Sequence, residues 1–188
     1  MTRWMWMGGV VMALAAFPAL AQSDGGSPPY GVYVEGGRTL EGGSPANAAS
    51  IGFTFPFGHR WGIWGGSVTG YGDVFVSEWR ARDAAGEGRR TYIQIGAIAT
   101  WRYRFADGAS PWFVDGGIGV SLMDKLYATP DRAFSTRFQF TEVLGIGRNF
   151  GANGAHELSL RVQHFSNAGI KKPNPGENFV RLRYQYHF

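Results

Sequence analysis

The feature that most restricts the fold of this chain is a two-residue alternation of apolar and polar side chains. From Ile93 to Phe105 the odd positions are apolar and mostly large, whereas the even positions are mostly polar or small. The segment from Val180 to Phe188 repeats this pattern and ends on its apolar face. Because successive side chains of a β-strand point to opposite sides of the sheet, both segments are predicted to be strands with one apolar face.

Six further segments alternate in the same way, three of them more weakly. They are residues 30–36, 51–57, 68–79, 112–122, 134–150 and 156–166. Eight strands of about ten residues, joined by alternating short and longer connections, fit the length of the chain. An even number of antiparallel strands is suited to closure into a barrel.

Composition favours strands and restricts the chemistry. The 188 residues include 29 glycines, 14 Phe, 8 Tyr and 7 Trp, with no cysteine. Glycine costs about 1 kcal/mol relative to alanine inside a helix, so such a composition is unfavourable for helices. The absence of cysteine excludes a disulfide scaffold, cysteine-ligated zinc and a thiol nucleophile. The pI of 9.6 comes from basic residues dispersed along the strands, which does not indicate nucleic-acid binding.

The first residues have the pattern of a signal peptide. Arg3 precedes an apolar stretch that ends in Ala19-Leu20-Ala21, a small-x-small cleavage pattern. No later segment resembles an apolar helix long enough to span a membrane. The predicted division is a signal peptide at 1–21, a polar leader at 22–29 and a single β-barrel domain at 30–188.

Two architectures can use these strands, a soluble lipocalin-like barrel with its apolar face inward and a membrane barrel with its apolar face outward. Aromatic side chains cluster at the end of residues 93–105 and again at the end of residues 180–188, as expected for girdles at two membrane interfaces. With the signal peptide and the terminal Phe188, this pattern predicts an all-β, eight-stranded antiparallel transmembrane barrel of the outer membrane. Its interior is expected to be filled by polar residues, including Asp73, Asp115, Glu157 and the strand arginines.

The strand predicted at residues 156–166 carries the clearest candidates for chemistry. Its apolar row of Leu158, Leu160 and Val162 continues as His164 and Ser166. An ionisable side chain on a lipid-facing stripe is costly, so its presence indicates function. The alternative is that the strand has left the membrane by His164 and that both side chains face water.

The residues that follow carry a family resemblance. Residues 164–178 read HFSNAGIKKPNPGEN, which resembles the signature of PagL-type lipid A 3-O-deacylases. Members of that family are outer-membrane esterases that remove the 3-position acyl chain of lipopolysaccharide. The resemblance implies lipid A as substrate, outer-membrane lipids as surroundings, and a serine hydrolase. No metal or cofactor is expected, since His59, His156 and His187 lack carboxylates at metal-ligand spacing. The competing interpretation is a small structural or adhesive barrel without catalysis.

By that resemblance, three residues form a catalytic triad and three others support it. The implied roles are Ser166 as nucleophile, His164 as base, Glu177 as the carboxylate that orients the imidazole, Asn167 and Gly169 as oxyanion-hole amides, and Asn174 as a support of the site loop. A serine is a weak nucleophile until a base takes its proton, and that base needs a partner on its other nitrogen.

The acid is where the resemblance and the alternation disagree. Strict alternation in the last strand places Glu177 on its polar face and Asn178 on its lipid-facing side, so Glu177 is expected to precede the regular strand. Glu142 is a rival, since it falls on an apolar row and lies opposite His164 if a turn forms near Asn153. Glu142 is otherwise a surface or bulge residue, or a support of the acid.

The topology predicts where a reaction would occur. An even number of strands puts both termini on one side, which export and insertion would leave in the periplasm. His164 and Ser166 would then lie toward the outer leaflet. Lys171 and Lys172 fall in the following loop, where they either contact lipid A phosphates or keep the loop soluble. The oligomeric state is left open, a homodimer included.

Overall fold

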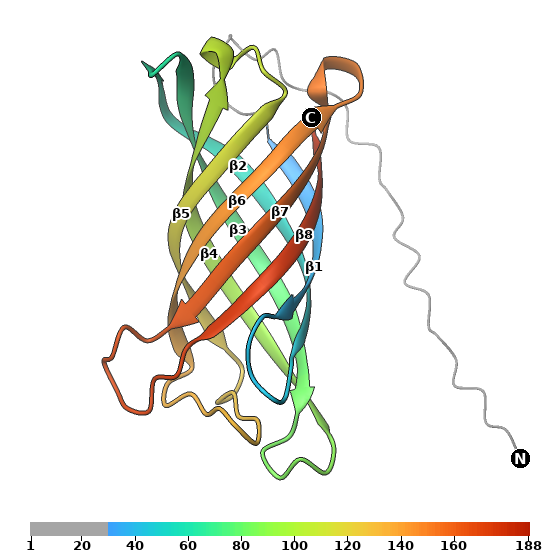
Figure 1. Cartoon of the computed structure of the whole chain (residues 1–188), viewed down its shortest axis with the longest axis vertical. Coiled ribbons are helices and arrows are strands. Elements are labelled where there is room, and N and C mark those ends of the chain that lie inside the picture. The colour runs from blue at the N-terminus through green and yellow to red at the C-terminus, as the bar shows by residue number, and fades with distance from the viewer. Residues whose placement is uncertain (1–29) are drawn as a thin grey trace, which may run out of the picture.

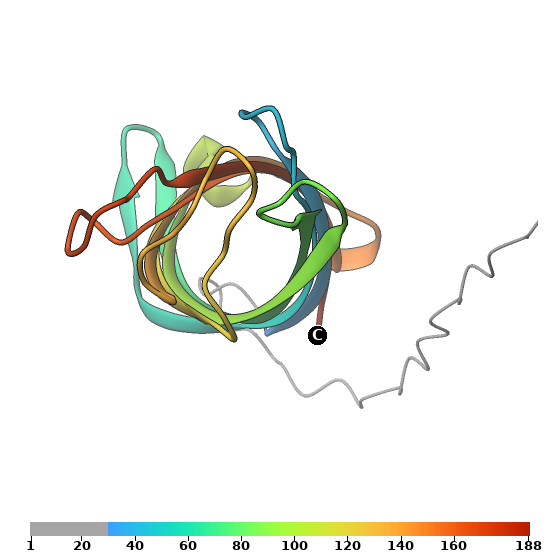
Figure 2. The same ribbon diagram turned by 90° about the horizontal axis from the view of Figure 1, so that it is seen from below.

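The computed structural model describes residues 30–188 as a closed ring of eight antiparallel strands (Figure 1). The predicted signal peptide and leader lie outside the described residues. The strands follow chain order around the ring, and β8 closes it by pairing with β1, as the view along the barrel shows (Figure 2). The strands are β1 (Gly31–Thr39), β2 (Asn47–Ile63), β3 (Gly66–Arg82), β4 (Arg89–Phe105), β5 (Trp112–Met123), β6 (Phe138–Phe150), β7 (His156–Ser166) and β8 (Glu177–His187). None of the described residues belongs to a helix long and apolar enough to cross a membrane.

The two ends of the barrel differ in their connections (Figure 1). At the end that carries the C-terminus, which we call the terminal end, the strands are joined at 64–65, 106–111 and 151–155, with 3-10 turns η1 (Ala106–Gly108) and η2 (Ala152–Gly154). At the opposite end, which we call the loop end, the connections are 40–46, 83–88, 124–137 and 167–176. The longest connections therefore gather at the end where β7 finishes and β8 begins.

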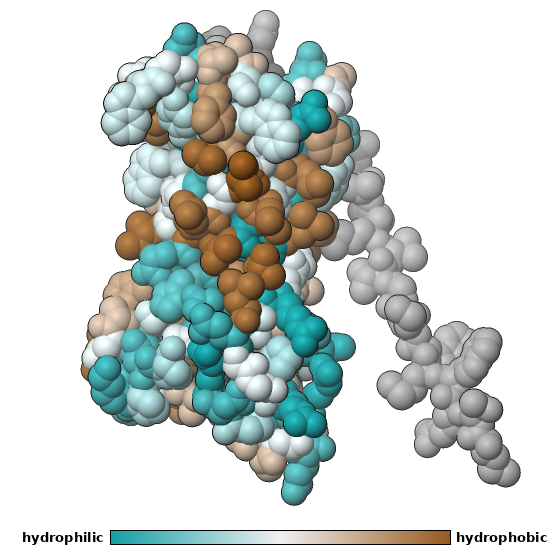
Figure 3. Space-filling model, in the orientation of Figure 1, coloured by the Kyte–Doolittle hydropathy of each residue, from teal (hydrophilic) through white to brown (hydrophobic). Residues whose placement is uncertain are grey.

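The outer wall of the barrel is apolar, as the alternation predicts. Outward-facing side chains such as Ile95 and Leu160 are 55% and 52% exposed, whereas their strand neighbours Gln94 and Arg161 are buried. Hydrophobic residues form a band across the middle of the barrel face in Figure 3, with hydrophilic residues toward the loop end. This inverts the arrangement of a water-soluble domain and confirms the barrel with its apolar face outward.

Charged side chains fill the interior, and they occur as paired groups. Arg183 lies 2.9 Å from Glu35 and 2.8 Å from Asp73, while Arg181 lies 2.9 Å from Glu35. Nearer the terminal end, Arg102 binds both Asp115 and Glu157, at 2.8 and 2.5 Å. Buried charges are costly unless they are paired, so the carboxylates and guanidinium groups of these pairs hold one another in position across the barrel.

An aromatic cluster closes the interior toward the loop end and backs the candidate site. The ring of Trp79 lies 4.5 Å from that of Phe179, 4.9 Å from Phe165 and 5.4 Å from Tyr127, and all four side chains are fully buried. Phe165 is the inward neighbour of His164 and Ser166 on β7. Packed aromatic rings of this kind hold the backbone beneath the outward side chains in one position.

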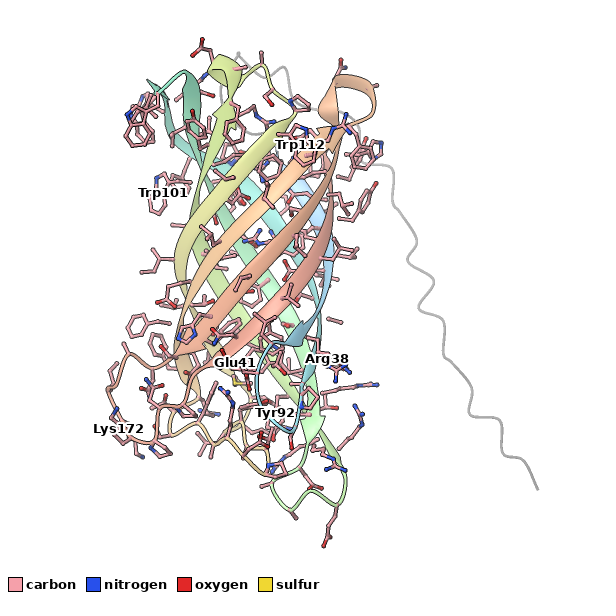
Figure 4. All side chains as sticks on the ribbon, in the orientation of Figure 1. Arg38, Glu41, Tyr92, Trp101, Trp112 and Lys172 are labelled. Carbon is pink, nitrogen blue, oxygen red and sulfur yellow. The ribbon has the colours of Figure 1, made fainter. Side chains whose placement is uncertain are left out.

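The prediction that two aromatic girdles mark opposite ends of the barrel was wrong in one respect. Phe105 on β4 pairs with Gly66, and His187 on β8 pairs with Gly31, so both aromatic clusters lie at the terminal end. Trp101 and Trp112 are seen there in Figure 4. The physical reason is that all even-numbered strands of an antiparallel barrel run in the same direction.

Candidate active site

His164 and Ser166 occupy the outward face of β7 at the loop end. Both side chains are partly exposed, whereas Gln163, which precedes them, and Phe165, which lies between them, are buried. The outward row that begins with apolar side chains on β7 thus ends in an imidazole and a hydroxyl, as predicted. Residues two apart on a strand share a face, with Cβ atoms within about 7 Å.

The hydrogen-bond partner of His164 is Asn178 on the adjacent strand. The two residues pair directly between β7 and β8, and Nδ1 of His164 lies 2.7 Å from Oδ1 of Asn178. Because an amide oxygen only accepts, this contact assigns the proton to Nδ1 and leaves Nε2 as the basic nitrogen. The imidazole is therefore fixed in the tautomer that a general base requires.

Glu177 lies on the opposite side of the same strand. It is the first residue of β8, pairs with Phe165 and is buried in the barrel mouth. Its Oε2 accepts a hydrogen bond of 3.0 Å from the hydroxyl of Tyr127, and Arg132 lies 3.7 Å from Oε1. Burial, together with the neighbouring carboxylate, raises the pKa of the Tyr127 hydroxyl, which therefore stays protonated as the donor. The structure does not bring Glu177 to His164.

The regular part of β8 begins earlier in the chain than the sequence pattern predicts. Glu177 was expected to precede it, but the β7–β8 ladder extends to the pair of Phe165 and Glu177. The alternation that assigned Glu177 to the polar face and Asn178 to the lipid-facing side therefore applies to both residues. The strand boundary, rather than the alternation, was the wrong expectation.

Glu142 lies where the predicted turn near Asn153 would place it. β6 and β7 pair Glu142 directly with His164, and the Glu142 side chain is exposed on the outer wall. Glu142, His164 and Asn178 therefore form a row across three strands, in which directly opposed side chains have Cβ atoms about 4.5–5.5 Å apart.

The amide that faces the serine hydroxyl belongs to Ala168. Its N–H lies 3.4 Å from Oγ of Ser166, and its φ of 52° turns the chain sharply after the strand. The amides of Asn167 and Gly169, the predicted oxyanion donors, are already bonded, at 3.0 Å to Oδ1 of Asn174 and at 2.9 Å to Oδ1 of Asn167. The backbone N–H directed at the Ser166 hydroxyl is thus that of Ala168, which lies between them.

Asn167 joins two connections behind this turn. Its buried side chain donates to Oγ of Ser135 at 3.0 Å and to the carbonyl of Lys171 at 2.8 Å. Asn174 completes the arrangement by accepting from the Asn167 backbone. The turn that carries Ala168 is therefore tied both to the connection 124–137 and to its own loop.

Among residues 30–188 no group of three or more His, Asp or Glu side chains is arranged to hold a metal ion. Two of the other histidines have different partners: His156 contacts the Tyr184 hydroxyl at 2.7 Å, and His187 contacts Glu157 at 2.9 Å.

Comparison with known proteins identifies the family of this barrel. Residues 47–187 match the family model described as lipid A 3-O-deacylase (PagL). The chain belongs to this family. A lipid A deacylase PagL of Bordetella bronchiseptica is 38% identical over 77 residues, 41% of this chain and 42% of that protein. Another, of Pseudomonas aeruginosa, is 31% identical over 120 residues, 64% of this chain and 65% of that protein.

A solved structure supports the same assignment. The crystal structure of the outer membrane enzyme PagL matches with a TM-score of 0.70 and 25% sequence identity. The match covers 84% of this chain and 99% of that one. This chain therefore shares the barrel fold of the solved protein over nearly all of that protein's length.

Sequence reasoning missed two residues that contact the predicted pair: Asn178 lies against His164, and Ala168 lies beside Ser166. Asn178 had been placed on the lipid-facing side by alternation, and that position was itself the signal that it could meet His164. Ala168 stands between the two amides that the resemblance implied, and nothing in its side chain distinguishes it. Its role depends on a positive φ, which residue type does not reveal.

Gly176 has no side chain, and the imidazole of His164 occupies the space that a Cβ would take. A Cβ at this position would lie 2.7 Å from Cε1 and 3.4 Å from Nε2 of His164, and the glycine φ is 68°. We expect Gly176→Ala to push the imidazole away from Asn178, and so to lower kcat by at least about tenfold, since small misplacements of reacting groups are costly. Esterase assays of the purified barrel would measure this.

Gly169 is the control for that change, because its φ is also positive, at 78°, while a Cβ there would meet no atom within 4 Å. Gly169→Ala carries the same backbone strain without the clash. Equal losses from both substitutions would show that strain, and not the imidazole position, determines the effect.

Proposed function

We propose that this chain is an outer-membrane serine esterase that hydrolyses the ester-linked acyl chain at the 3-position of lipid A. The observation that carries the proposal is the outward-facing pair His164 and Ser166 at the end of the apolar row of β7, with Nδ1 of the imidazole 2.7 Å from Oδ1 of Asn178. The relatives' names describe the same activity for those proteins. A hydrolase for a soluble substrate would have no reason to display its nucleophile toward lipid.

The proposed reaction begins when Oγ of Ser166 attacks the ester carbonyl while Nε2 of His164 takes the hydroxyl proton. The tetrahedral oxygen becomes negative and accepts a hydrogen bond from the N–H of Ala168, which lies beside the nucleophile. The imidazolium then protonates the departing sugar oxygen, which leaves an acyl-serine. Water, deprotonated by the same imidazole, attacks the acyl-serine and releases a 3-hydroxy fatty acid.

The proposed third member is Asn178, although the resemblance implied Glu177. The amide oxygen of Asn178 holds the required tautomer, while the buried Glu177 carboxylate binds Tyr127 and Arg132. Asn178 carries no charge to stabilise the imidazolium. Glu142, opposite His164 on the same outer face, is the carboxylate proposed to supply it.

The substrate is proposed to approach laterally from the outer leaflet. The apolar row of Leu158, Leu160 and Val162 lies on the same face of β7 as the site and offers a surface for acyl chains. Lys171 and Lys172 are exposed in the connection beyond it, toward water, where a phosphorylated headgroup would lie. A water molecule reaches the acyl-enzyme only near this interface, which agrees with a site at the strand end.

Mass spectrometry of lipid A tests this proposal directly. A Gram-negative host that expresses the full chain should lose one ester-linked 3-hydroxyacyl group from its lipid A. The membranes should also be assayed after permeabilisation with detergent, so that a latent enzyme meets its substrate. Unaltered lipid A in permeabilised membranes that contain the folded barrel would reject the proposed function.

A further inference from the structure

The outer wall changes from apolar to cationic at the loop end of β1, β3 and β4. The outward row of β1 passes from Val34 to Arg38, and that of β3 from Val76 through Glu78 to Arg80 and Arg82. On β4 the outward row of Ile95, Ile93 and Thr91 ends at Arg89. We call Arg38, Arg80, Arg82 and Arg89 the cationic belt.

Strand register brings these arginines into one surface. Arg38 pairs with Asn47 of β2, and Asn47 in turn pairs with Arg80 of β3. On its other side Arg38 pairs with Val180 of β8, two residues from Asn178. The belt therefore begins beside the candidate active site and continues around the barrel away from it. Arg38 lies at the loop end in Figure 4.

Arg82 and Arg89 are directly opposite each other in the β3–β4 ladder and share the outward face. Like charges in this position repel, so the arrangement is unfavourable without an anion between them. Within residues 30–188, Arg80 is the belt residue that forms a salt bridge, at 2.6 Å to Glu78. Asp83 and Glu87 lie in the connection 83–88, and the Asp83 carboxylate accepts from the backbone N–H of Glu87.

We propose that the cationic belt binds the phosphate groups of outer-leaflet lipid A. Guanidinium groups bind phosphate oxygens in a bidentate manner, and several of them at one level match the charge of a phosphorylated headgroup. The change from valine and isoleucine to arginine places the belt where acyl chains end and headgroups begin. Within residues 30–188, Arg38, Arg82 and Arg89 form no salt bridge, so their guanidinium groups are available to an anion at this level of the wall.

The inference rests on the proposed outer-membrane placement but not on catalysis. The full chain with Ser166→Ala, which should bind lipid without hydrolysing it, would be titrated in mixed micelles with diphosphoryl lipid A and with dephosphorylated lipid A. Adding Arg82→Gln and Arg89→Gln should weaken binding of the diphosphoryl lipid by about thirtyfold, the order expected for two basic residues at an anionic lipid surface. The loss should shrink at high salt.

The matched control removes two arginines at the terminal end. Arg60→Gln with Arg148→Gln also removes two positive charges. Both arginines lie at the terminal end, where Arg60 donates to the Asp107 carbonyl and Arg148 lies over the Trp112 ring. This control should bind diphosphoryl lipid A as the parent does. Equal losses in the two double variants, or equal losses for both lipids, would overturn the proposal. So would full displacement of the lipid by an equimolar amount of inorganic phosphate.

The two proposals can fail separately. If the wild-type chain leaves lipid A unaltered but the belt still distinguishes the two lipids, the proposed esterase is wrong and the proposed phosphate binding stands. If the wild-type chain hydrolyses lipid A but Arg82→Gln with Arg89→Gln leaves lipid binding unchanged, the proposed phosphate binding is wrong and the proposed esterase stands.

Discussion

Ser166→Ala is expected to abolish release of the 3-hydroxy fatty acid, with a loss of about 10⁶ in kcat, the size seen when a serine hydrolase loses its nucleophile. The substitution removes a single oxygen from a partly exposed position on the barrel wall, so the fold should not change. Lipid A mass spectra from cells that express the variant, together with fatty-acid release by the purified protein, would measure the loss.

Two controls make this result specific. The variant should keep the heat-dependent gel mobility of a closed barrel, which separates loss of chemistry from loss of structure. Ser110→Ala makes the same change at the terminal end, where the hydroxyl accepts a hydrogen bond from the backbone N–H of Trp112. This variant should leave turnover unchanged. Retained release by Ser166→Ala would assign the nucleophile elsewhere.

The fold could be predicted from sequence because the barrel wall separates two environments. Every strand must place one set of alternate residues against lipid-like surroundings and the other in a polar interior, so the period of two is visible in all eight strands. The row that ends in His164 and Ser166 was predicted for the same reason. The connections lack such a constraint: Phe134, expected in a strand, instead lies buried in the connection 124–137.

The composition of the site could be predicted only in part. A motif gives residue types in order, but it does not say where a strand begins, and a shift of one residue moves a side chain to the other face of the wall. Glu177 and Asn178 show this directly, since the carboxylate faces the interior and the neighbouring amide meets the imidazole. The proposed oxyanion donor, the backbone N–H of Ala168, depends on a turn with positive φ, and the alanine side chain does not indicate such a turn.

Asn178→Ala is expected to lower kcat by about 10²–10⁴ without a comparable change in KM. Removing the acceptor frees the imidazole to rotate and to adopt the wrong tautomer, and in serine hydrolases loss of the proper partner on Nδ1 costs up to about 10⁴. Asn178→Asp keeps an acceptor oxygen at the same place and should restore most of the turnover. A residue that merely stabilised the strand would not show such recovery, so single-turnover kinetics of both variants would distinguish the two roles.

Glu177→Gln provides the opposing comparison. The glutamine amide can still accept from Tyr127, and the Glu177 side chain points into the barrel mouth away from His164, so kcat should change little. If Glu177 oriented His164 instead, the pattern would invert, with a loss of orders of magnitude in Glu177→Gln and a mild effect in Asn178→Ala. Because the two residues are adjacent on one strand, any general disturbance of β8 would affect both variants. Only a direct contact with the imidazole separates them.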